Sequence, residues 1–378
     1  MAANRVLFIF GTRPEAIKLA PVIRFFREDD LRFQVQVCVT AQHRQLLDGV
    51  LQTFHIAPDY DLDAMRPDQT LTSVTTRVLA DLEPVLERSK PDMVVVQGDT
   101  TTTFCGALAA FYKGIPVAHV EAGLRTGDVS QPFPEEMNRV LTGRIAALHL
   151  AATERARENL LGESVPASSI AVTGNSGIDA VLFVRDRLAS GALNAPDWPW
   201  LDASKKLLVV TAHRRENFGV GFEQICRAIA RIAERPDVQI VFPVHPNPNV
   251  TGPVERNLSG RANITLIQPL EYVPFVDLMR RAYLLLTDSG GIQEEGPSLG
   301  KPILVMREKT ERPEAVEAGT VELVGTGVEK IVHRVEALFD PMEYQRRSRI
   351  HNPYGDGQSS RRIASAVHSF FTHSSRDR

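Results

Sequence analysis

Short, continuously apolar segments alternate with longer amphipathic segments along nearly the whole chain. The first series comprises residues 5–10, 34–39, 92–97, 116–120 and 148–152. The second series comprises residues 205–211, 238–244, 263–267, 282–288, 302–306 and 321–325. Strands that are apolar throughout are typical of a parallel sheet covered by helices on both faces. The pattern therefore predicts the α/β class, with two doubly wound domains in tandem.

The expected domain boundary is the turn-rich segment 162–178. It divides the chain into a domain of residues 1–170 and a second domain of residues 171–357. The remaining segment, about 358–378, reads as an amphipathic helix that could pack back on the first domain. A length of 378 residues fits two domains of ordinary size.

The composition excludes several classes of ligand and site. With a net charge of −3 and no run of basic residues, neither nucleic acid nor a membrane surface is an expected partner. The three cysteines, Cys38, Cys105 and Cys226, are far apart in apolar runs and form no metal or disulfide pattern. No G-x-G-x-x-G follows a strand, which argues against a classical nicotinamide or flavin site. The apolar run near the N-terminus is too short for a signal or a membrane span, so the cytoplasm is the expected location.

Polar motifs follow the predicted strands of the first domain, where ligands of open α/β sheets lie. Arg13 could be an ordinary surface arginine or a charge clamp on a phosphate. Asp99 could be only the N-cap of the next helix, and Glu135 with Glu136 could be only acids favoured in a first helical turn. Together, however, Asp99, Glu121 and Glu135 could surround one cleft with three carboxylates. Such clusters can separate a general acid from a general base.

Two histidines follow predicted strands of the second domain. His213 comes directly after the strand 205–211, with Arg214 and Arg215 beside it. A lone histidine is more often structural than catalytic, but one next to two arginines is a candidate for phosphate binding or proton transfer. His245 ends a second strand and is the weaker candidate.

The segment LLLTDSGGIQEEGPSLGKP, residues 284–302, passes from a buried strand through a glycine turn into a helix. Backbone N–H groups at such a turn can hold phosphate, and an acidic side chain one turn later can accept the hydroxyls of a ribose diol. This predicts a sugar nucleotide, and Glu294 should point away from it. The assignment is Ser289, Gly290 and Gly291 around a diphosphate, Glu295 on the diol, Phe275 against the base and Arg312 near phosphate.

Taken together, these stretches resemble the non-hydrolysing UDP-N-acetylglucosamine 2-epimerases. The matching motifs extend from about residue 5 to about residue 364 and include FGTRPEAIKLAPV, TAQHRQLLD, GDTTTT, HVEAGLRTGD, PFPEEMNR, TGNSGIDA, HRRENFG and DSGGIQEEGPSLGKP. The resemblance implies two Rossmann-like domains, arranged as in many glycosyltransferases, with the active site in a cleft between them. It implies interconversion of UDP-N-acetylglucosamine (UDP-GlcNAc) and UDP-N-acetylmannosamine (UDP-ManNAc), through elimination of UDP to a 2-acetamidoglucal and re-addition. No cofactor and no metal are implied, and the product would supply surface polysaccharide synthesis.

The resemblance also assigns residues by position. It implies a catalytic set of Asp99, Glu121, Glu135 and His213. It implies a substrate-binding set of Arg13, Lys18, Phe275, Ser289, Gly290, Gly291, Glu295 and Arg312. It further implies a homodimer and a second, activating UDP-GlcNAc at an allosteric site made by Gln42, Gln45, Arg214 and His245. Two positions depart from the pattern: Leu270 replaces a polar residue that contacts uracil in some members, and Asp68 stands where a basic residue is expected.

Several other functions compete with this interpretation. The main alternative is a glycosyltransferase of the same architecture, and a different kind is a non-catalytic sensor of sugar nucleotides. A closer alternative is an epimerase of another UDP-2-acetamido sugar, such as a 2,3-diacetamido uronate. A hydrolysing epimerase that releases free N-acetylmannosamine is a further alternative.

Overall fold

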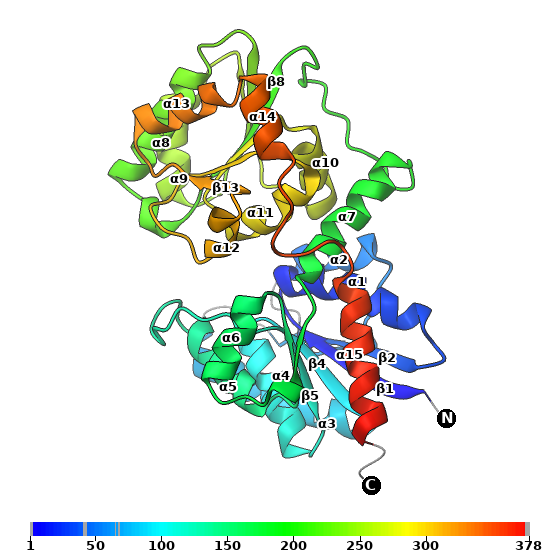
Figure 1. Ribbon diagram of the computed structural model, residues 1–378. Helices are drawn as coiled ribbons and strands as arrows, with labels where there is room; N and C mark the ends of the chain where they lie inside the picture. Colours follow the sequence, from blue (N-terminus) through cyan, green and yellow to red (C-terminus); the bar gives the residue numbers. More distant parts are fainter. Residues whose placement is uncertain (1–2, 41–43, 65, 67–68, 375–378) are drawn as a thin grey trace. The chain divides into compact units, whose positions relative to one another are not determined.

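The computed structural model describes residues 3–40, 44–64, 66 and 69–374, with the main chain alone described at 44–46 and 374. The chain divides into two compact units (Figure 1). The first unit is Met1–Ala180 together with Tyr354–Arg378, and the second is Val181–Pro353. Each unit has its own parallel sheet and its own core.

The first unit contains a seven-stranded parallel sheet in the order β3-β2-β1-β4-β5-β6-β7. Its strands are β1 (Asn4–Phe10), β2 (Phe33–Val39), β3 (Tyr60–Asp61), β4 (Met93–Gln97), β5 (Val117–Ala122), β6 (Leu148–Ala151) and β7 (Ile170–Val172). Its helices are α1 (Arg13–Glu28), α2 (Arg44–Thr53), α3 (Leu71–Ser89), α4 (Thr101–Tyr112), α5 (Glu135–Ile145), α6 (Glu154–Gly162), the start of α7 (Ser176–Ala189) and α15 (Ser359–Ser374). The strand order reverses between β1 and β4.

Strand β1 is apolar at every central position because both of its faces are covered. Leu7 and Ile9 belong to the cluster that contains Leu82 of α3. On the other face, the ring of Phe8 packs edge-on against Phe26 of α1, with ring centroids 5.3 Å apart. Burial of each such side chain contributes about 1.5–3 kcal/mol. Helix α15 lies beside α1 in the same unit (Figure 1).

The units divide after Ala180 rather than after residue 170, where the sequence suggested a boundary. Strand β7 spans that suggested boundary and pairs with β6, so the whole strand belongs to the first sheet. The chain returns to the first unit at Tyr354, whose carbonyl accepts a hydrogen bond of 2.8 Å from the Asn175 N–H. A strand of three residues gives no apolar run long enough to mark the division in the sequence.

The second unit contains a six-stranded parallel sheet in the order β10-β9-β8-β11-β12-β13. Its strands are β8 (Lys206–Thr211), β9 (Val238–Pro243), β10 (Ile264–Ile267), β11 (Leu284–Thr287), β12 (Ile303–Val305) and β13 (Val321–Leu323). Its helices are α8 (Val220–Ile232), α9 (Pro248–Leu258), α10 (Tyr272–Arg281), α11 (Gly290–Glu295), α12 (Pro313–Glu317), α13 (Val328–Ala337) and α14 (Pro341–Ser348), with the 3₁₀ turns η2 (Arg215–Asn217) and η3 (Gly296–Leu299). Here the order reverses between β8 and β11.

Helix α8 illustrates how the second core is built. Phe222, Ile225 and Ile229 are fully buried and recur at the spacing of one helical face. They belong to the same cluster as Leu208 and Val210 of β8. The predicted α/β class with two doubly wound, Rossmann-like domains is therefore confirmed.

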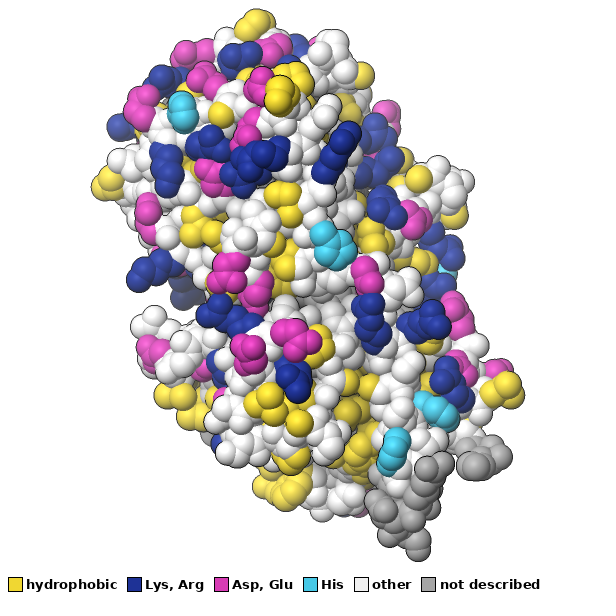
Figure 2. Space-filling model, viewed as in Figure 1, with side chains coloured by type: hydrophobic (Ala, Val, Ile, Leu, Met, Phe, Trp, Pro, Cys, Tyr) yellow, Lys and Arg dark blue, Asp and Glu magenta, His cyan; other side chains and the backbone are white. Residues whose placement is uncertain are grey.

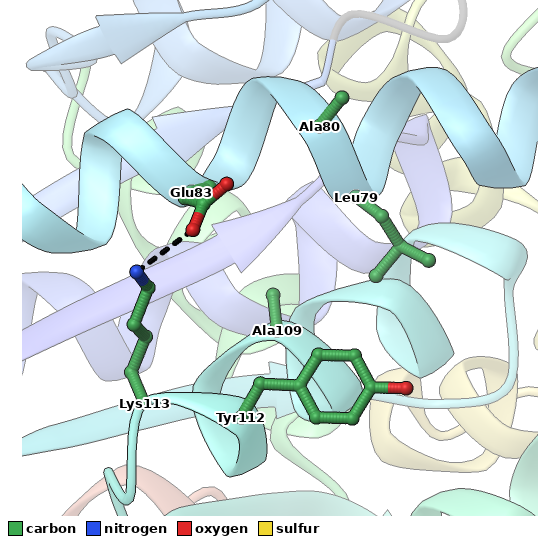
Figure 3. A pocket seen from close by; sticks show the side chains of 6 residues that line it. All are labelled: Leu79, Ala80, Glu83, Ala109, Tyr112 and Lys113. Carbon is green, nitrogen blue, oxygen red and sulfur yellow. Dashed lines mark hydrogen bonds and ion pairs between the residues drawn. The ribbon is translucent and has the colours of Figure 1, made fainter.

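One pocket lies between α3 and α4 of the first unit (Figure 3). Its volume of about 250 Å³ is below the usual range for ligand pockets. Tyr112 borders it, and the ammonium group of Lys113 is 2.8 Å from the Glu83 carboxylate. On the face shown in Figure 2, basic and acidic side chains are interspersed.

Candidate active site

The candidate residues of each unit follow strands on either side of the point where its strand order reverses. In the first unit Arg13 begins the helix after β1, Asp99 lies in the turn after β4, and Glu121 is near the carboxyl end of β5. In the second unit the loops after β8 and β11 carry His213 and Ser289. Ligands of open α/β sheets bind outside the carboxyl ends of the strands at this switch point. Each unit therefore presents its candidate residues where its topology favours a ligand.

Glu121 occupies an unusual backbone position near the end of β5. Its φ angle is +65°, in the left-handed region, and the pairing of β5 with β6 shifts register here. Its two carboxylate oxygens are 2.7 and 2.6 Å from Nζ of Lys18, and the Gln97 amide also donates to it. Backbone strain of this kind costs about 1–3 kcal/mol and is concentrated at functional sites. The strained main chain thus aims a carboxylate that Lys18 contacts through both oxygens.

Asp99 is held by helix α5. The Arg139 guanidinium forms an ion pair with the Asp99 carboxylate, and Asn138 donates a 2.9 Å hydrogen bond to the Asp99 carbonyl. The Asp99 side chain nevertheless remains 29% exposed, so it can still meet a ligand. It is therefore more than the helix cap considered from the sequence, and the N-cap of α4 is Thr100.

The two neighbouring acids at the start of α5 have different environments. Glu136 is buried, accepts the Thr126 and Gly127 N–H groups at 2.9 and 3.2 Å, and pairs with Arg139 at 2.8 Å. Glu135 is partly exposed, and the described residues give it no hydrogen bond or ion pair. Glu136 thus stabilises the start of α5 and the preceding loop, whereas Glu135 is the acid of the two that could contact a ligand.

Glu15 joins the loop after β1 to the loop after β4. It is buried and accepts the Gly11 and Thr12 N–H groups at 3.2 and 2.7 Å, completing a capping box at the start of α1. Its other oxygen accepts the hydroxyls of Thr100 and Thr103 at 2.8 and 3.2 Å. Burial raises the pKa of Glu15, against the opposing effect of these hydrogen bonds. The helix that carries Arg13 and Lys18 is thereby fixed relative to the loop of Asp99.

In the second unit, Asp288 organises the loop that carries His213. Asp288 is fully buried, and its Oδ2 accepts the N–H groups of His213 and Arg214 at 2.9 and 2.8 Å and the Asn217 amide at 3.2 Å. Its Oδ1 lies 3.7 Å from Nδ1 of His213. The His213 ring stacks on His245, with centroids 5.4 Å apart. The pKa of His213 is lowered overall, mainly by burial. Asp288 opposes this shift, and His245 and Arg214 add to it.

The glycine turn after β11 lies against three charged side chains. A Cβ at Gly290 would be 3.3 Å from the Arg312 guanidinium carbon, 3.3 Å from Glu311 Oε1 and 3.5 Å from Arg214 Nη2. Ser289 is the N-cap of α11, but its side chain does not cap the helix. The turn therefore combines N–H groups of a helix start with two guanidinium groups, a suitable setting for a diphosphate.

Glu294 points toward Arg312. The Arg312 Nε–H donates to Glu294 at 2.7 Å, and both side chains are largely buried. The prediction that Arg312 meets phosphate is compatible with this pair, because a guanidinium group has five donors. Glu294 fixes the direction of the arginine.

Glu311 lies among three arginines. It is 2.6 Å from Arg307 Nη1, 3.3 Å from Arg312 Nη1 and 3.5 Å from Arg214 Nη2. Burial alone would raise its pKa, but the arginines outweigh burial and lower the pKa to about 2. Arg307 also pairs with Glu216, and Arg312 with Glu294, so the three arginines are matched by three carboxylates.

Glu295 and Phe275 come from neighbouring elements of the second unit. Glu295 is the last residue of α11 and Phe275 lies in α10, and both are partly buried. Helix α10 contacts η3, which directly follows Glu295. This arrangement is compatible with a base near Phe275 and a ribose near Glu295.

The residues expected at an allosteric site are only partly described. Gln42 lies outside the described residues, as do the side chain of Gln45 and residue Asp68. Arg214 and His245 belong to the cluster around His213 and the glycine turn.

Sequence reasoning missed Arg139, Gln97, Asp288 and Glu311, which hold the candidate residues in place. Asp288 could have been found, because a carboxylate that ends the buried strand LLLT directly before a Ser-Gly-Gly turn needs a partner. Arg139 has no such signal, since its position inside α5 is significant only once α5 packs beside α4.

The described residues also bear on the expectations about metals and membranes. No cluster of three or more metal-ligating side chains was found among them. None of the helices in the described part of the chain is long and apolar enough to cross a membrane.

Comparisons with known proteins identify the family. The family model for UDP-N-acetylglucosamine 2-epimerase matches residues 27–368. A UDP-N-acetylglucosamine 2-epimerase of Yersinia pestis is 58% identical over 373 residues, covering 96% of this chain and 98% of the relative. The crystal structure of the Neisseria meningitidis UDP-GlcNAc 2-epimerase bound to UDP-GlcNAc matches with a TM-score of 0.88 and 48% identity, covering 96% of this chain and 99% of that one. The Methanocaldococcus jannaschii enzyme in complex with UDP-GlcNAc and UDP matches with a TM-score of 0.78 and 36% identity, covering 96% and 99%. The chain belongs to the UDP-N-acetylglucosamine 2-epimerase family.

Proposed function

We propose that the protein is an isomerase that interconverts UDP-GlcNAc and UDP-ManNAc. A base removes the C2 proton while the bond from C1 to the UDP oxygen breaks, which leaves UDP and a 2-acetamidoglucal. A proton then returns to C2 from the other face as UDP adds back to C1. The observation that carries the proposal is the pair of cation-held carboxylates, Asp99 and Glu121, at the switch point of the first sheet.

Inversion at C2 requires proton transfer on both faces of the sugar ring, and thus two acid/base groups. Asp99 lies in the turn after β4 and Glu121 near the end of the adjacent strand β5, so both carboxylates could reach one ligand. Glu135, without a partner among the described residues, is the third carboxylate of the proposed set. Lys18 and Arg139 form ion pairs with Glu121 and Asp99 and so fix the direction of both carboxylates.

The second unit supplies what a departing UDP needs. The glycine turn and the guanidinium groups of Arg214 and Arg312 would stabilise the diphosphate while it is detached from the sugar. His213, with its lowered pKa, would be neutral at pH 7 and able to exchange a proton with the leaving group. We assign the ribose diol to Glu295 and the base to Phe275, and Arg13 to the phosphates.

The proposal extends to further partners. UDP-GlcNAc and UDP are the ligands named for the related structures from N. meningitidis and M. jannaschii, which supports the same ligands here. A second UDP-GlcNAc is proposed as an activator near Arg214 and His245, where the guanidinium and imidazole groups suit a phosphate.

A homodimer is part of the same proposal. Helices α3, α4 and α5 are neighbours, and their outer side carries exposed apolar side chains. Phe111, Tyr112 and Met137 are 59%, 71% and 40% exposed. Apolar surface of this kind is typical of an interface. Sedimentation analysis of the wild-type protein and of a Phe111→Glu, Tyr112→Glu variant would test this surface.

Incubation with UDP-GlcNAc in deuterium oxide tests the central proposal. An epimerase must form UDP-ManNAc and place deuterium at C2 of both sugars, and an Asp99→Asn variant should do neither at a comparable rate. UDP-sugar binding without exchange would indicate a sensor, and sugar transfer to an acceptor would indicate a transferase. Accumulation of free UDP and N-acetylmannosamine would indicate a hydrolysing enzyme. A much higher kcat/KM with a UDP-2,3-diacetamido uronate would reassign the substrate.

A further inference from the structure

A buried histidine holds the turn that carries Asp99. His119 lies in β5 and is 1% exposed, and its Nε2 is 2.7 Å from the carbonyl oxygen of Gly98. Gly98 has a φ angle of +76°, so the turn between β4 and α4 adopts a conformation that favours glycine. The Gly98 N–H also donates a hydrogen bond of 3.0 Å to the Val120 carbonyl of β5.

The hydrogen bond fixes the tautomer of His119. A carbonyl oxygen can only accept, so Nε2 must carry the hydrogen and Nδ1 must be unprotonated. Burial lowers the pKa of His119 to about 4, which keeps the ring neutral at physiological pH. His119 is therefore a constant N–H donor rather than a group that exchanges protons during turnover.

The same turn is held from a second side by α5. Asn138 donates to the carbonyl of Asp99, the residue that follows Gly98, and Arg139 pairs with the Asp99 carboxylate. Two consecutive carbonyl groups and one carboxylate are thus fixed by side chains of β5 and α5. An aspartate that only capped a helix would not require such support for its main chain.

We propose that His119 is a positioning residue for Asp99 in the epimerase reaction. The inference rests on the proposed function, because it assumes that Asp99 transfers a proton. In this proposal His119 does not touch the substrate. Its Nε2–H donates to the Gly98 carbonyl, which fixes the turn and so the position of the Asp99 carboxylate relative to C2. A shift of about 1 Å in a catalytic group can cost about 10²-fold in rate.

The neighbouring strand offers a matched control. His149 of β6 pairs with His119 in the sheet register, is 2% exposed and places its Nε2 2.9 Å from the Gly143 carbonyl. Gly143 lies near the end of α5, four positions after Arg139, and His149 Nδ1 is also 3.4 Å from the Ser169 carbonyl. Loss of either histidine removes buried hydrogen bonding to main-chain carbonyls, but of the two only His119 bonds to the turn that carries Asp99.

The test compares His119→Leu, His119→Gln and His149→Leu in the full-length protein. We expect His119→Leu to lower kcat by about 10–100-fold with KM changed less than about 3-fold, since the affinity for UDP resides elsewhere. Glutamine can place an amide N–H near the position of Nε2, so His119→Gln should recover kcat to within about 5-fold of wild type. His149→Leu should reduce the melting temperature about as much as His119→Leu does, but it should keep kcat within about 3-fold of wild type.

Three results would overturn the inference: unchanged kcat in His119→Leu, an equal loss of kcat in His149→Leu, or a loss that appears in KM alone. If His119→Leu fails to fold, His119→Asn replaces it, because its amide is too short to reach Gly98. Equal kcat for the asparagine and glutamine variants would then refute the proposal. Failure of the proposed function itself is recognised separately, since the wild-type protein would then show no C2 exchange.

Discussion

Removal of the Lys18 ammonium should destabilise the first unit through Glu121. Nζ of Lys18 lies 2.7 and 2.6 Å from the two oxygens of Glu121, and the two side chains are only 16% and 9% exposed. In Lys18→Met the carboxylate would stay enclosed without its cation. Methionine keeps most of the aliphatic length of lysine, so the packing changes little.

The expected loss of stability in Lys18→Met follows from the burial of this ion pair. Two unit charges 4 Å apart attract by about 4 kcal/mol at an effective dielectric constant of about 20, and breaking an enclosed ion pair costs about 3–5 kcal/mol. Because the lysine keeps some contact with water, we expect Lys18→Met to cost about 2–3 kcal/mol. For a unit of about 200 residues this corresponds to a fall of about 5–10 °C in melting temperature. In a Glu121→Gln background the same substitution should cost less than about 1 kcal/mol.

The assay is a double-mutant cycle on Lys18→Met, Glu121→Gln and the double variant, measured by thermal unfolding and by turnover. Glu121→Gln should lower turnover by at least about 10²-fold, the scale of an acid/base group. If Lys18 acts through Glu121, adding Lys18→Met to Glu121→Gln should lower turnover little further. The Arg5–Asp92 pair, at the opposite end of the same sheet, is the control. Its side chains are each 41% exposed, so its coupling should stay below about 1 kcal/mol.

Additive effects of the two substitutions on stability would refute this reasoning. So would a coupling no larger than that of the control pair, since the ion pair would then contribute nothing beyond surface charge. Independent, multiplicative losses of turnover would return Lys18 to the role that the family resemblance implied, a direct contact with substrate.

Further predictions concern the charged groups of both units. Asp99→Asn should lower turnover by at least about 10²-fold without loss of UDP affinity in calorimetry, and near-normal activity would remove Asp99 from the catalytic set. Glu294→Gln should weaken UDP binding by about 3–10-fold, because Arg312 loses a charge-assisted hydrogen bond that orients it; unchanged affinity would contradict this role. Glu311 has its pKa lowered to about 2 in the folded protein, so its contribution to stability is present above pH 4.5 and is lost as the pH falls toward 2. Glu311→Gln should therefore lower the free energy of unfolding at pH 7 by no more than about 3 kcal/mol. Its melting temperature should also fall less than that of the wild type between pH 4.5 and 2, and parallel curves of melting temperature against pH would contradict the assignment.

Much of the fold was predictable because it depends on local pattern. Strand β1 is apolar at every central position since both of its faces are covered, and this leaves a clear signal in the sequence. Strands β3 and β7 have two and three residues, and segments this short produce no periodicity. The division of the units was placed too early for the same reason, because β7 was not recognised as a strand of the first sheet.

The sequence suggested candidate residues where a polar side chain stands at or just after the end of a strand, as at Asp99, Glu121 and His213. The residues that hold them were not, because their positions depend on packing between distant segments. Arg139 is 40 positions from Asp99, and His119 lies within an apolar run in which a histidine gives no functional signal. Sequence pattern suggests which groups could contact a ligand, whereas tertiary packing decides which groups orient them.

The paired acids after the glycine turn illustrate the difference. From the sequence, Glu294 and Glu295 posed a conflict with phosphate, and helical geometry predicted only that Glu294 points away. The structure identifies what Glu294 meets: the guanidinium of Arg312, 18 positions later, with only 5% of the glutamate side chain exposed. At the proposed diphosphate site such a carboxylate would be favourable, because it fixes the direction of Arg312 and is itself paired with that arginine. The acid would therefore strengthen the proposed site instead of opposing it.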